Sequence, residues 1–182
     1  MGNGVIKPGC TSISLGTSGV VFTAVDKPIY DKFGRTHTFC HAVENMWHIM
    51  GVTQGCGLSV NWFRKNFAQA YSYAELDGNA KEITSDGIIY LPYLMGERTP
   101  HLDLIAEALL RAFQLIITVS IFTELYLKAF ASALKIAVRV ICESGIDLNT
   151  VKVGGGGAKS RLWLQILADI TTNNLYSSQC VE

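Results

Sequence analysis

The run Val153-Gly154-Gly155-Gly156-Gly157-Ala158-Lys159-Ser160-Arg161-Leu162-Trp163 places four consecutive glycines between a short apolar segment and an apparent helix. A glycine inside a helix or strand costs about 0.5–1 kcal/mol relative to alanine, so regular structure explains four in succession poorly. They indicate a strand-to-helix connection whose backbone a ligand approaches closely, with the free N–H groups of the next helix turned toward it. The run therefore predicts a nucleotide site. A tight turn that serves packing alone is the alternative.

Two common glycine-rich phosphate motifs do not fit this run. A Walker A loop has a glycine directly before its Lys-Ser pair, whereas Ala158 precedes Lys159 here, and a dinucleotide fingerprint needs a third glycine where Lys159 stands. The run also lies near the end of the chain rather than after the first strand, and no acidic residue follows at a suitable distance. A Rossmann-type dinucleotide or methyl-donor binder is therefore disfavoured.

Composition indicates a folded chain without a bulk charge. The 182 residues contain 15 basic and 15 acidic side chains, which argues against nucleic acid and anionic membrane as partners. Hydrophobic residues make up 49% of the chain, well outside the range of disordered proteins. A chain of this length buries about 70% of its unfolded surface, enough for one substantial domain or a two-lobed one.

The cysteines, the histidines and the N-terminus predict a soluble cytoplasmic protein without a metal site. Five scattered cysteines without a Cys-x-x-Cys pair argue against disulfides and zinc: Cys10, Cys40, Cys56, Cys142 and Cys180. His37, His41 and His48 lack metal-ligand spacing, and a surface or structural role is expected for them. The first eight residues show no apolar signal region, and the charge-free apolar run at 112–123 is shorter than the roughly 18 residues of a membrane span.

Periodicity predicts strands first, then alternating helices and strands. Strands are expected at 10–15 and 19–25, with a hairpin turn at 16–18, and strand material at 38–53 around a turn at Glu44-Asn45. Helical spacing covers 58–67, a weak helix 71–83, a buried strand 88–91 and a helix 123–143 ended by Gly145. A strand at 151–153 and a helix at 160–170 follow. The β-branched run 116–123 resembles a strand, and 104–122 stays unassigned.

Four segments in this order resemble the C-terminal domain of the FGGY family of carbohydrate kinases. They are Ser-Ile-Ser-Leu-Gly-Thr-Ser-Gly at 12–19, Trp-His-Ile-Met-Gly-Val-Thr at 47–53, Leu-Pro-Tyr-Leu-Met-Gly-Glu-Arg-Thr-Pro-His at 91–101, and the glycine run. The resemblance covers nearly the whole chain and points to the xylulose-phosphorylating branch of the family. It implies an α/β fold, an actin-like ATPase (ribonuclease H-like) domain with a mixed sheet and flanking helices.

The resemblance assigns ATP and Mg²⁺ as cofactors and implies two nucleotide-contacting bends. The phosphate turn comprises Gly16, Thr17, Ser18 and Gly19, whose N–H groups and Thr17 hydroxyl would meet phosphate oxygens. An ordinary hairpin turn is the alternative. The glycine loop comprises Gly154, Gly155, Gly156, Gly157 and Ala158, on which the adenosine would lie, with Ser160 at the ribose or base edge.

Simpler roles are expected for several side chains beside these bends. Helix capping is expected for Ser160, exposure to solvent for Lys159 and Arg161, and a place in the core for Trp163. Farther upstream, Glu97, Arg98 and His101 share one loop. There we expect an ion pair and a histidine to order a domain interface.

The resemblance also implies that this chain is one half of an enzyme. The catalytic aspartate would lie upstream of Met1, so no catalytic residue and no metal ligand is assigned here. The chain, 1–182, is expected to be a nucleotide-binding domain truncated at both ends and inactive alone. Its partners would be an N-terminal sugar-binding domain and a ketopentose such as xylulose, and a homodimer is considered. A non-catalytic actin-like interaction module is the alternative function.

The chain departs from the family pattern between residues 104 and 131. The special residues of the family are replaced at Leu104, Ala106-Glu107-Ala108, Ala112-Phe113-Gln114 and Leu127-Lys128-Ala129-Phe130-Ala131. Larger residues in place of glycine, and Lys128 in place of an acid, predict a narrower nucleotide site with an inverted local charge. The central hypothesis is spatial: the bend at Thr17 and the glycine loop converge on opposite ends of one ATP molecule.

Overall fold

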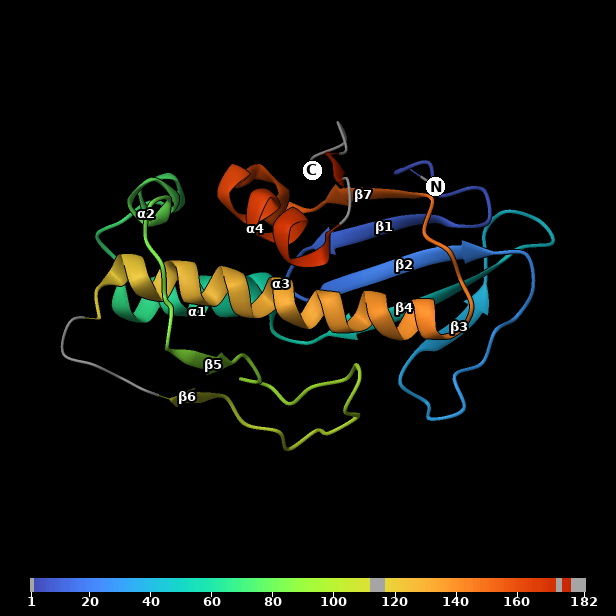
Figure 1. The fold of residues 1–182 in the computed structure, drawn as a ribbon, viewed down its shortest axis with the longest axis horizontal. Coiled ribbons are helices and arrows are strands. Elements are labelled where there is room, and N and C mark those ends of the chain that lie inside the picture. Colours follow the sequence, from blue (N-terminus) through green and yellow to red (C-terminus); the bar gives the residue numbers. More distant parts are fainter. Residues whose placement is uncertain (1, 112–116, 173–174, 178–182) are drawn as a thin grey trace.

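The computed structural model describes residues 2–111, 117–172 and 175–177 (Figure 1). Its elements are β1 (Cys10–Leu15), β2 (Gly19–Val25), β3 (His37–Cys40), β4 (Trp47–Thr53), α1 (Cys56–Phe67), α2 (Tyr73–Ala80), β5 (Ile89–Leu91), β6 (Leu109–Arg111), α3 (Val119–Glu143), β7 (Thr150–Gly154), the 3-10 turn η1 (Gly156–Lys159), α4 (Arg161–Thr171) and β8 (Leu175–Ser177). Each helix and strand assigned from the sequence has a counterpart, although α3 begins earlier than expected.

Six strands form one mixed sheet in the order β3-β4-β2-β1-β7-β8, and β5 and β6 form a separate antiparallel pair. The first four strands of the sheet are antiparallel neighbours, whereas β7 pairs in parallel with β1 and β8 in parallel with β7. The parallel pairs require long crossovers, which α3 and α4 supply. The mixed sheet with flanking helices confirms the predicted fold class.

The core lies between one face of the sheet and α3 with α4, which cross it side by side (Figure 1). Alternate residues of the strands are buried on this face, as in the iBiBiB pattern of β1, because successive side chains point to opposite sides. Ala137 of α3 lies so close to the sheet that a Cβ added to Gly51 of β4 would be 2.9 Å from its Cβ. Phe130 and Leu134 are completely buried beside it.

The start of α3 differs from the sequence prediction. The β-branched run 116–123 favoured a strand, yet the helix begins at Val119, where the Thr118 hydroxyl accepts a hydrogen bond from the Ile121 N–H at 3.3 Å. The first turns then pack Tyr126 against Phe63 of α1, with ring centroids 5.0 Å apart. Tertiary packing and a helix cap therefore override the modest β preference of this run.

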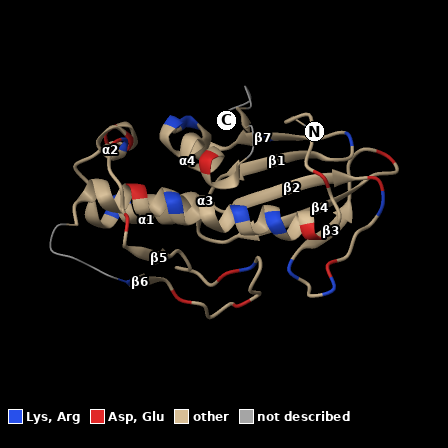
Figure 2. Cartoon of the chain, viewed as in Figure 1, with Lys and Arg blue, Asp and Glu red and all other residues tan. Residues whose placement is uncertain are grey.

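The segment 104–122, which the sequence left unassigned, contributes strand β6, which pairs with β5. Ala112, Phe113, Gln114 and Cys180 lie outside the described residues. The four described cysteines form no disulfide, and no described helix has the length and apolar character that crossing a membrane requires. Along α3 the basic residues Lys128, Lys135 and Arg139 lie between the acidic residues Glu124 and Glu143 (Figure 2).

Candidate nucleotide site

The phosphate turn and the glycine loop lie next to each other at one edge of the sheet. Strands β1 and β7 are parallel, and their last paired residues are Ser14 and Gly154. Both strands therefore end at the same edge of the sheet, where β1 leads into the phosphate turn and β7 leads into the glycine loop. A Cβ added to Gly155 would be 2.9 Å from the carbonyl carbon and oxygen of Leu15, so the two backbones are in contact. The two bends are therefore adjacent, as expected, and their binding of one ATP molecule stays a prediction.

The glycines of the loop divide into packing and open positions. Gly155 has φ +88°, and it lies on the Leu15 backbone. A Cβ at Gly157 would be 2.6 Å from the Trp163 ring and 2.7 Å from the Leu15 Cβ. A Cβ at Gly156 would meet nothing within 4 Å, and the residue is exposed. Gly156 is thus the loop position that offers open backbone to a ligand.

The start of helix α1 holds the phosphate turn through two backbone hydrogen bonds. The Gly57 N–H donates to the Gly16 carbonyl at 2.8 Å, and the Leu58 N–H donates to the Thr17 carbonyl at 3.1 Å. A Cβ on Gly57 would be 2.5 Å from the Gly16 oxygen, so only glycine fits there. The sequence showed the glycines beside Cys56 only as a break before a helix. Their contact with the turn depends on a pairing about 40 residues distant along the chain.

The hydroxyls of the phosphate turn remain available to a ligand. Thr17 is exposed and Ser18 is half-buried. Neither hydroxyl forms a hydrogen bond with any other residue in the described part of the chain. The turn is closed by its own backbone, where the Gly16 N–H donates to the Ser18 carbonyl at 3.2 Å. It therefore presents hydroxyls and backbone at the open edge of the sheet, next to the glycine loop.

The residues after the glycine loop have the simpler roles expected of them. Ser160 is the N-cap of α4, where its hydroxyl accepts a hydrogen bond from the Trp163 N–H at 3.0 Å. Trp163 is in the core with 3% exposure, and Lys159 and Arg161 are exposed. Ala158 packs half-buried against the core. Ser160 thus stabilises the helix start that carries the loop.

Asp77 of α2 is a neighbour of the glycine loop that the sequence did not reveal. Burial raises the pKa of its carboxyl group, and a side-chain hydrogen bond with Ser160 partly offsets that rise. An acidic side chain beside a loop that would carry adenosine is a candidate acceptor for ribose hydroxyls. No local signal marks Asp77, because its approach to Ser160 depends on how α2 packs.

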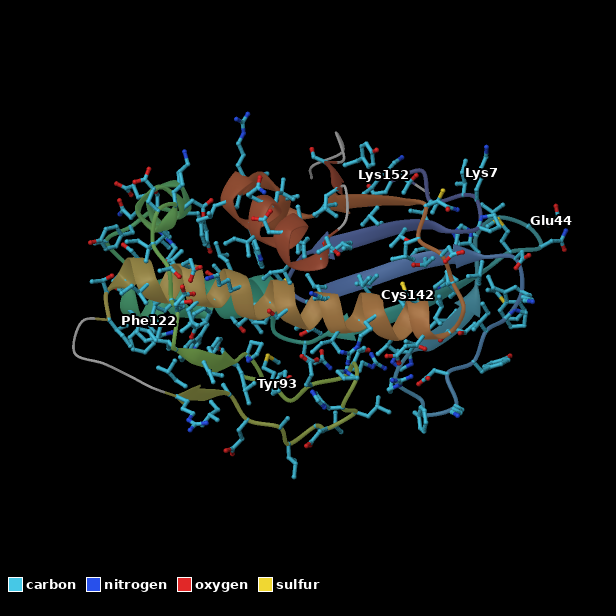
Figure 3. All side chains as sticks on the ribbon, viewed as in Figure 1. Lys7, Glu44, Tyr93, Phe122, Cys142 and Lys152 are labelled. Carbon is cyan, nitrogen blue, oxygen red and sulfur yellow. The ribbon has the colours of Figure 1, made fainter. Side chains whose placement is uncertain are left out.

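The loop that contains Glu97 differs from expectation. Arg98 approaches the Glu97 carboxylate through its backbone N–H at 2.7 Å, and no ion pair joins their side chains in the described residues. His101 pairs instead with Tyr93, whose hydroxyl lies 3.1 Å from His101 Nε2. Figure 3 shows Tyr93 on the side of α3 away from α4. Glu97 itself is buried, and this burial raises the pKa of its carboxyl group.

Lys128 and Ala129, where the chain departs from the family pattern, line a separate open pocket of about 270 Å³ between α3 and residues 85–90. None of the residues that line this pocket belongs to either bend. The Lys128 ammonium lies 2.6 Å from the carboxylate of Glu124 and 3.7 Å from that of Asp86. These two acids therefore balance the charge of Lys128.

Replacement of Lys128 by methionine is expected to lower the free energy of unfolding by about 1–2 kcal/mol, because Glu124 would lose its cation while 4% exposed. The estimate is small because the Lys128 side chain is 37% exposed. Urea denaturation measures this change. The double variant Glu124→Gln/Lys128→Met should recover most of the loss, and simple additivity of the two single effects would contradict the coupling.

The chain offers Mg²⁺ few ligands of its own. Among the described residues, no group of three or more His, Cys, Asp or Glu side chains has the arrangement of a metal site. The available oxygens at the phosphate turn are hydroxyls and carbonyls. Mg²⁺ keeps several waters and is commonly held by substrate phosphates with one or two carboxylates. The residues present thus fit an ion that enters with the nucleotide.

Comparisons with known proteins agree with this geometry. Residues 11–182 match the family described as "FGGY family of carbohydrate kinases, C-terminal domain". The xylulose kinase of Bacillus subtilis (strain 168) is 34% identical over 172 residues, 93% of this chain and 34% of that protein. That of Escherichia coli (strain K12) is 30% identical over 177 residues, 96% of this chain and 36% of that protein. The chain therefore spans about a third of the length of these relatives.

A solved structure gives the same result. The crystal structure of xylulose kinase from Rhodospirillum rubrum superposes with a TM-score of 0.88 at 26% identity. The superposition covers 97% of this chain and 36% of that one.

Proposed function

The chain belongs to the FGGY family of carbohydrate kinases, and from this premise we propose that it is the ATP-binding half of a sugar kinase. In this proposal the complete enzyme transfers the γ-phosphate of ATP to a hydroxyl of a ketopentose such as D-xylulose. The three relatives named above are xylulose kinases, and their names support the choice of sugar. A cytoplasmic location is part of the same proposal.

The observation that carries the proposal is the meeting of two bends at one sheet edge. The phosphate turn offers the free hydroxyl of Thr17, and the glycine loop offers the open backbone of Gly156. A nucleotide that spans them would lay its adenosine over Gly156 and its β- and γ-phosphates on the turn. The turn's N–H groups and hydroxyls would stabilise charge on the phosphate oxygens, which is the main contribution a protein makes to phosphoryl transfer.

The remaining chemistry belongs to other parts of the proposed enzyme. Mg²⁺ supplies neutralisation of phosphate charge when it is bound. The base that accepts the sugar hydroxyl proton, and most sugar contacts, would come from an N-terminal domain with which this chain associates. This chain would then hold and orient ATP and exclude water at the sheet edge, and it would have no kinase activity alone.

Titration with Mg·ATP tests the proposal. At a hundredfold excess over Kd, bound nucleotide is expected to stabilise the chain by about 2.7 kcal/mol, seen as a higher melting temperature. Replacement of Thr17 by valine keeps the shape but removes the hydroxyl, and should weaken ATP about fivefold to tenfold in calorimetric titration. Thr150 lies at the opposite end of β7, so Thr150→Val is the matched control and should bind normally.

Two results would contradict the proposal. If Mg·ATP neither binds nor shifts the melting temperature of the unaltered chain, the function becomes that of a non-catalytic actin-like module. If ATP binds equally to the Thr17→Val and Thr150→Val variants, the nucleotide lies elsewhere. If the unaltered chain binds Mg·ATP, addition of the N-terminal domain of a xylulose kinase relative should restore phosphorylation of xylulose. If it does not bind, no phosphorylation is expected.

A further inference from the structure

Glu97 is a buried carboxylate with three hydrogen-bond donors. The residue is 2% exposed. One oxygen accepts from the Thr53 hydroxyl at 2.6 Å, and the other accepts from the backbone N–H groups of Gln54 at 3.1 Å and Arg98 at 2.7 Å. No described lysine or arginine side chain forms an ion pair with it. An apolar side chain there would leave buried donors unsatisfied, so the carboxylate has a definite bonding role.

The loop that carries Glu97 is itself firmly attached. Glu97 and Asp103 exchange two backbone hydrogen bonds, of 2.8 and 2.9 Å. The Thr99 N–H donates to the Val52 carbonyl, and the Val52 N–H donates to the Thr99 hydroxyl, both at 2.9 Å. The Thr99 hydroxyl in turn donates to the Arg35 carbonyl at 2.9 Å. These hydrogen bonds fix the position of the backbone that carries the Glu97 carboxylate.

The partners of Glu97 lie directly under the phosphate turn. Thr53 is the cross-strand partner of Gly19, and a Cβ on Gly19 would be 2.6 Å from the Thr53 Cγ2. Gln54 begins the short connection from β4 into α1. Two residues into α1, the N–H groups of Gly57 and Leu58 hold the carbonyls at the other end of the turn. Both ends of the turn therefore contact the segment 53–58, which Glu97 binds through Thr53 and Gln54.

We propose that Glu97 is a positioning residue for the phosphate turn, which it holds through Thr53, Gln54 and the start of α1 without touching the nucleotide. The position of the turn follows from the contacts described above, and only its ligand rests on the proposed function. In the complete enzyme the carboxylate would fix the turn's N–H groups before ATP arrives.

Hydrogen exchange of the ligand-free chain tests the positioning directly. Glu97→Gln keeps the shape but removes the charge and opposes an amide NH₂ to the Thr53 hydroxyl. We expect the Gly57 and Leu58 amides to exchange about tenfold faster, because a charge-assisted hydrogen bond that holds their segment is weakened. Amides in the middle of α3, such as Leu134, should not change. The matched control is Glu107→Gln, the same substitution at an exposed residue of the same chain region.

Nucleotide binding gives the second readout. With the turn displaced, the affinity for Mg·ATP should fall about tenfold while that for adenosine stays unchanged, because adenosine makes no phosphate contact. A general loss of structure would weaken both ligands alike. If Glu97→Gln does not fold, Thr53→Val, which removes the hydroxyl donor from the opposite side, should produce the same selective exchange.

The outcomes separate this inference from the proposed function. Faster exchange confined to the Gly57 and Leu58 region, in a chain that binds no ATP, would support the positioning and reject the nucleotide. Unchanged exchange there, or a rise shared with α3, would overturn the positioning role even if the unaltered chain binds ATP tightly.

Discussion

Replacement of Gly155 by alanine is expected to lower the free energy of unfolding by about 2–5 kcal/mol. The backbone of Gly155 has φ +88° and ψ 174°, a conformation that residues with a side chain rarely adopt. In addition, the new Cβ would lie 2.9 Å from the carbonyl carbon and oxygen of Leu15 and 3.2 Å from its nitrogen. These atoms belong to a central strand, so no side-chain rotation relieves the clash. Chemical denaturation with urea measures the loss.

The matched control is the next residue. Gly156→Ala introduces the same methyl group where nothing lies within 4 Å, and it should change the free energy of unfolding by no more than about 0.5 kcal/mol. Equal costs at the two positions would show that the loop lies differently on β1. A large difference would support the division of the loop glycines into packing and open positions.

The strands and the caps near the two bends were largely predictable from local sequence. The expected strands at 10–15 and 19–25 coincide with β1 and β2, because the turn residues Gly16, Thr17 and Ser18 separate two β-rich runs. Ser160 was expected to cap a helix and does so. These features depend on residues within a few positions of one another, and the sequence shows such neighbours directly.

The helix was expected from about Thr123, and α3 begins four residues earlier, at Val119, inside the segment that the sequence left unassigned. Ile116 to Thr123 is rich in β-branched residues, but a local preference of a few tenths of a kcal/mol is small beside the burial of an aromatic face. Phe122 and Tyr126 pack against Phe63 of α1, about 60 residues away. That contact is invisible in the sequence until the topology is known.

The candidate site was predictable only through the resemblance to a family. The residues alone gave two unusual bends, and nothing in their spacing showed that β1 and β7 pair in parallel. The supporting residues were missed for the same reason. Gly57 meets Gly16, Asp77 meets Ser160, and Glu97 meets Thr53, each across a gap of about 40 residues or more.

Gly156→Val is expected to lower the affinity for Mg·ATP by about a hundredfold or more while the fold is retained. A Cβ added at Gly156 would meet nothing within 4 Å apart from its chain neighbours, so the branched side chain of valine would extend into the open space beside the loop. That space is where the proposed adenosine would lie, and overlap of a bound group with a fixed side chain costs several kcal/mol. Isothermal titration calorimetry measures the affinity, and circular dichroism the fold.

The control is Gly78→Val, the same substitution at an exposed glycine of α2 that also has nothing within 4 Å. This variant should bind Mg·ATP as the unaltered chain does, and Gly156→Ala should fall between the two. Because residue 156 is exposed and an added Cβ would meet nothing within 4 Å, we expect the substitution to leave the core intact, which circular dichroism checks. Retention of full ATP affinity by Gly156→Val would therefore mean that the nucleotide does not lie on the glycine loop.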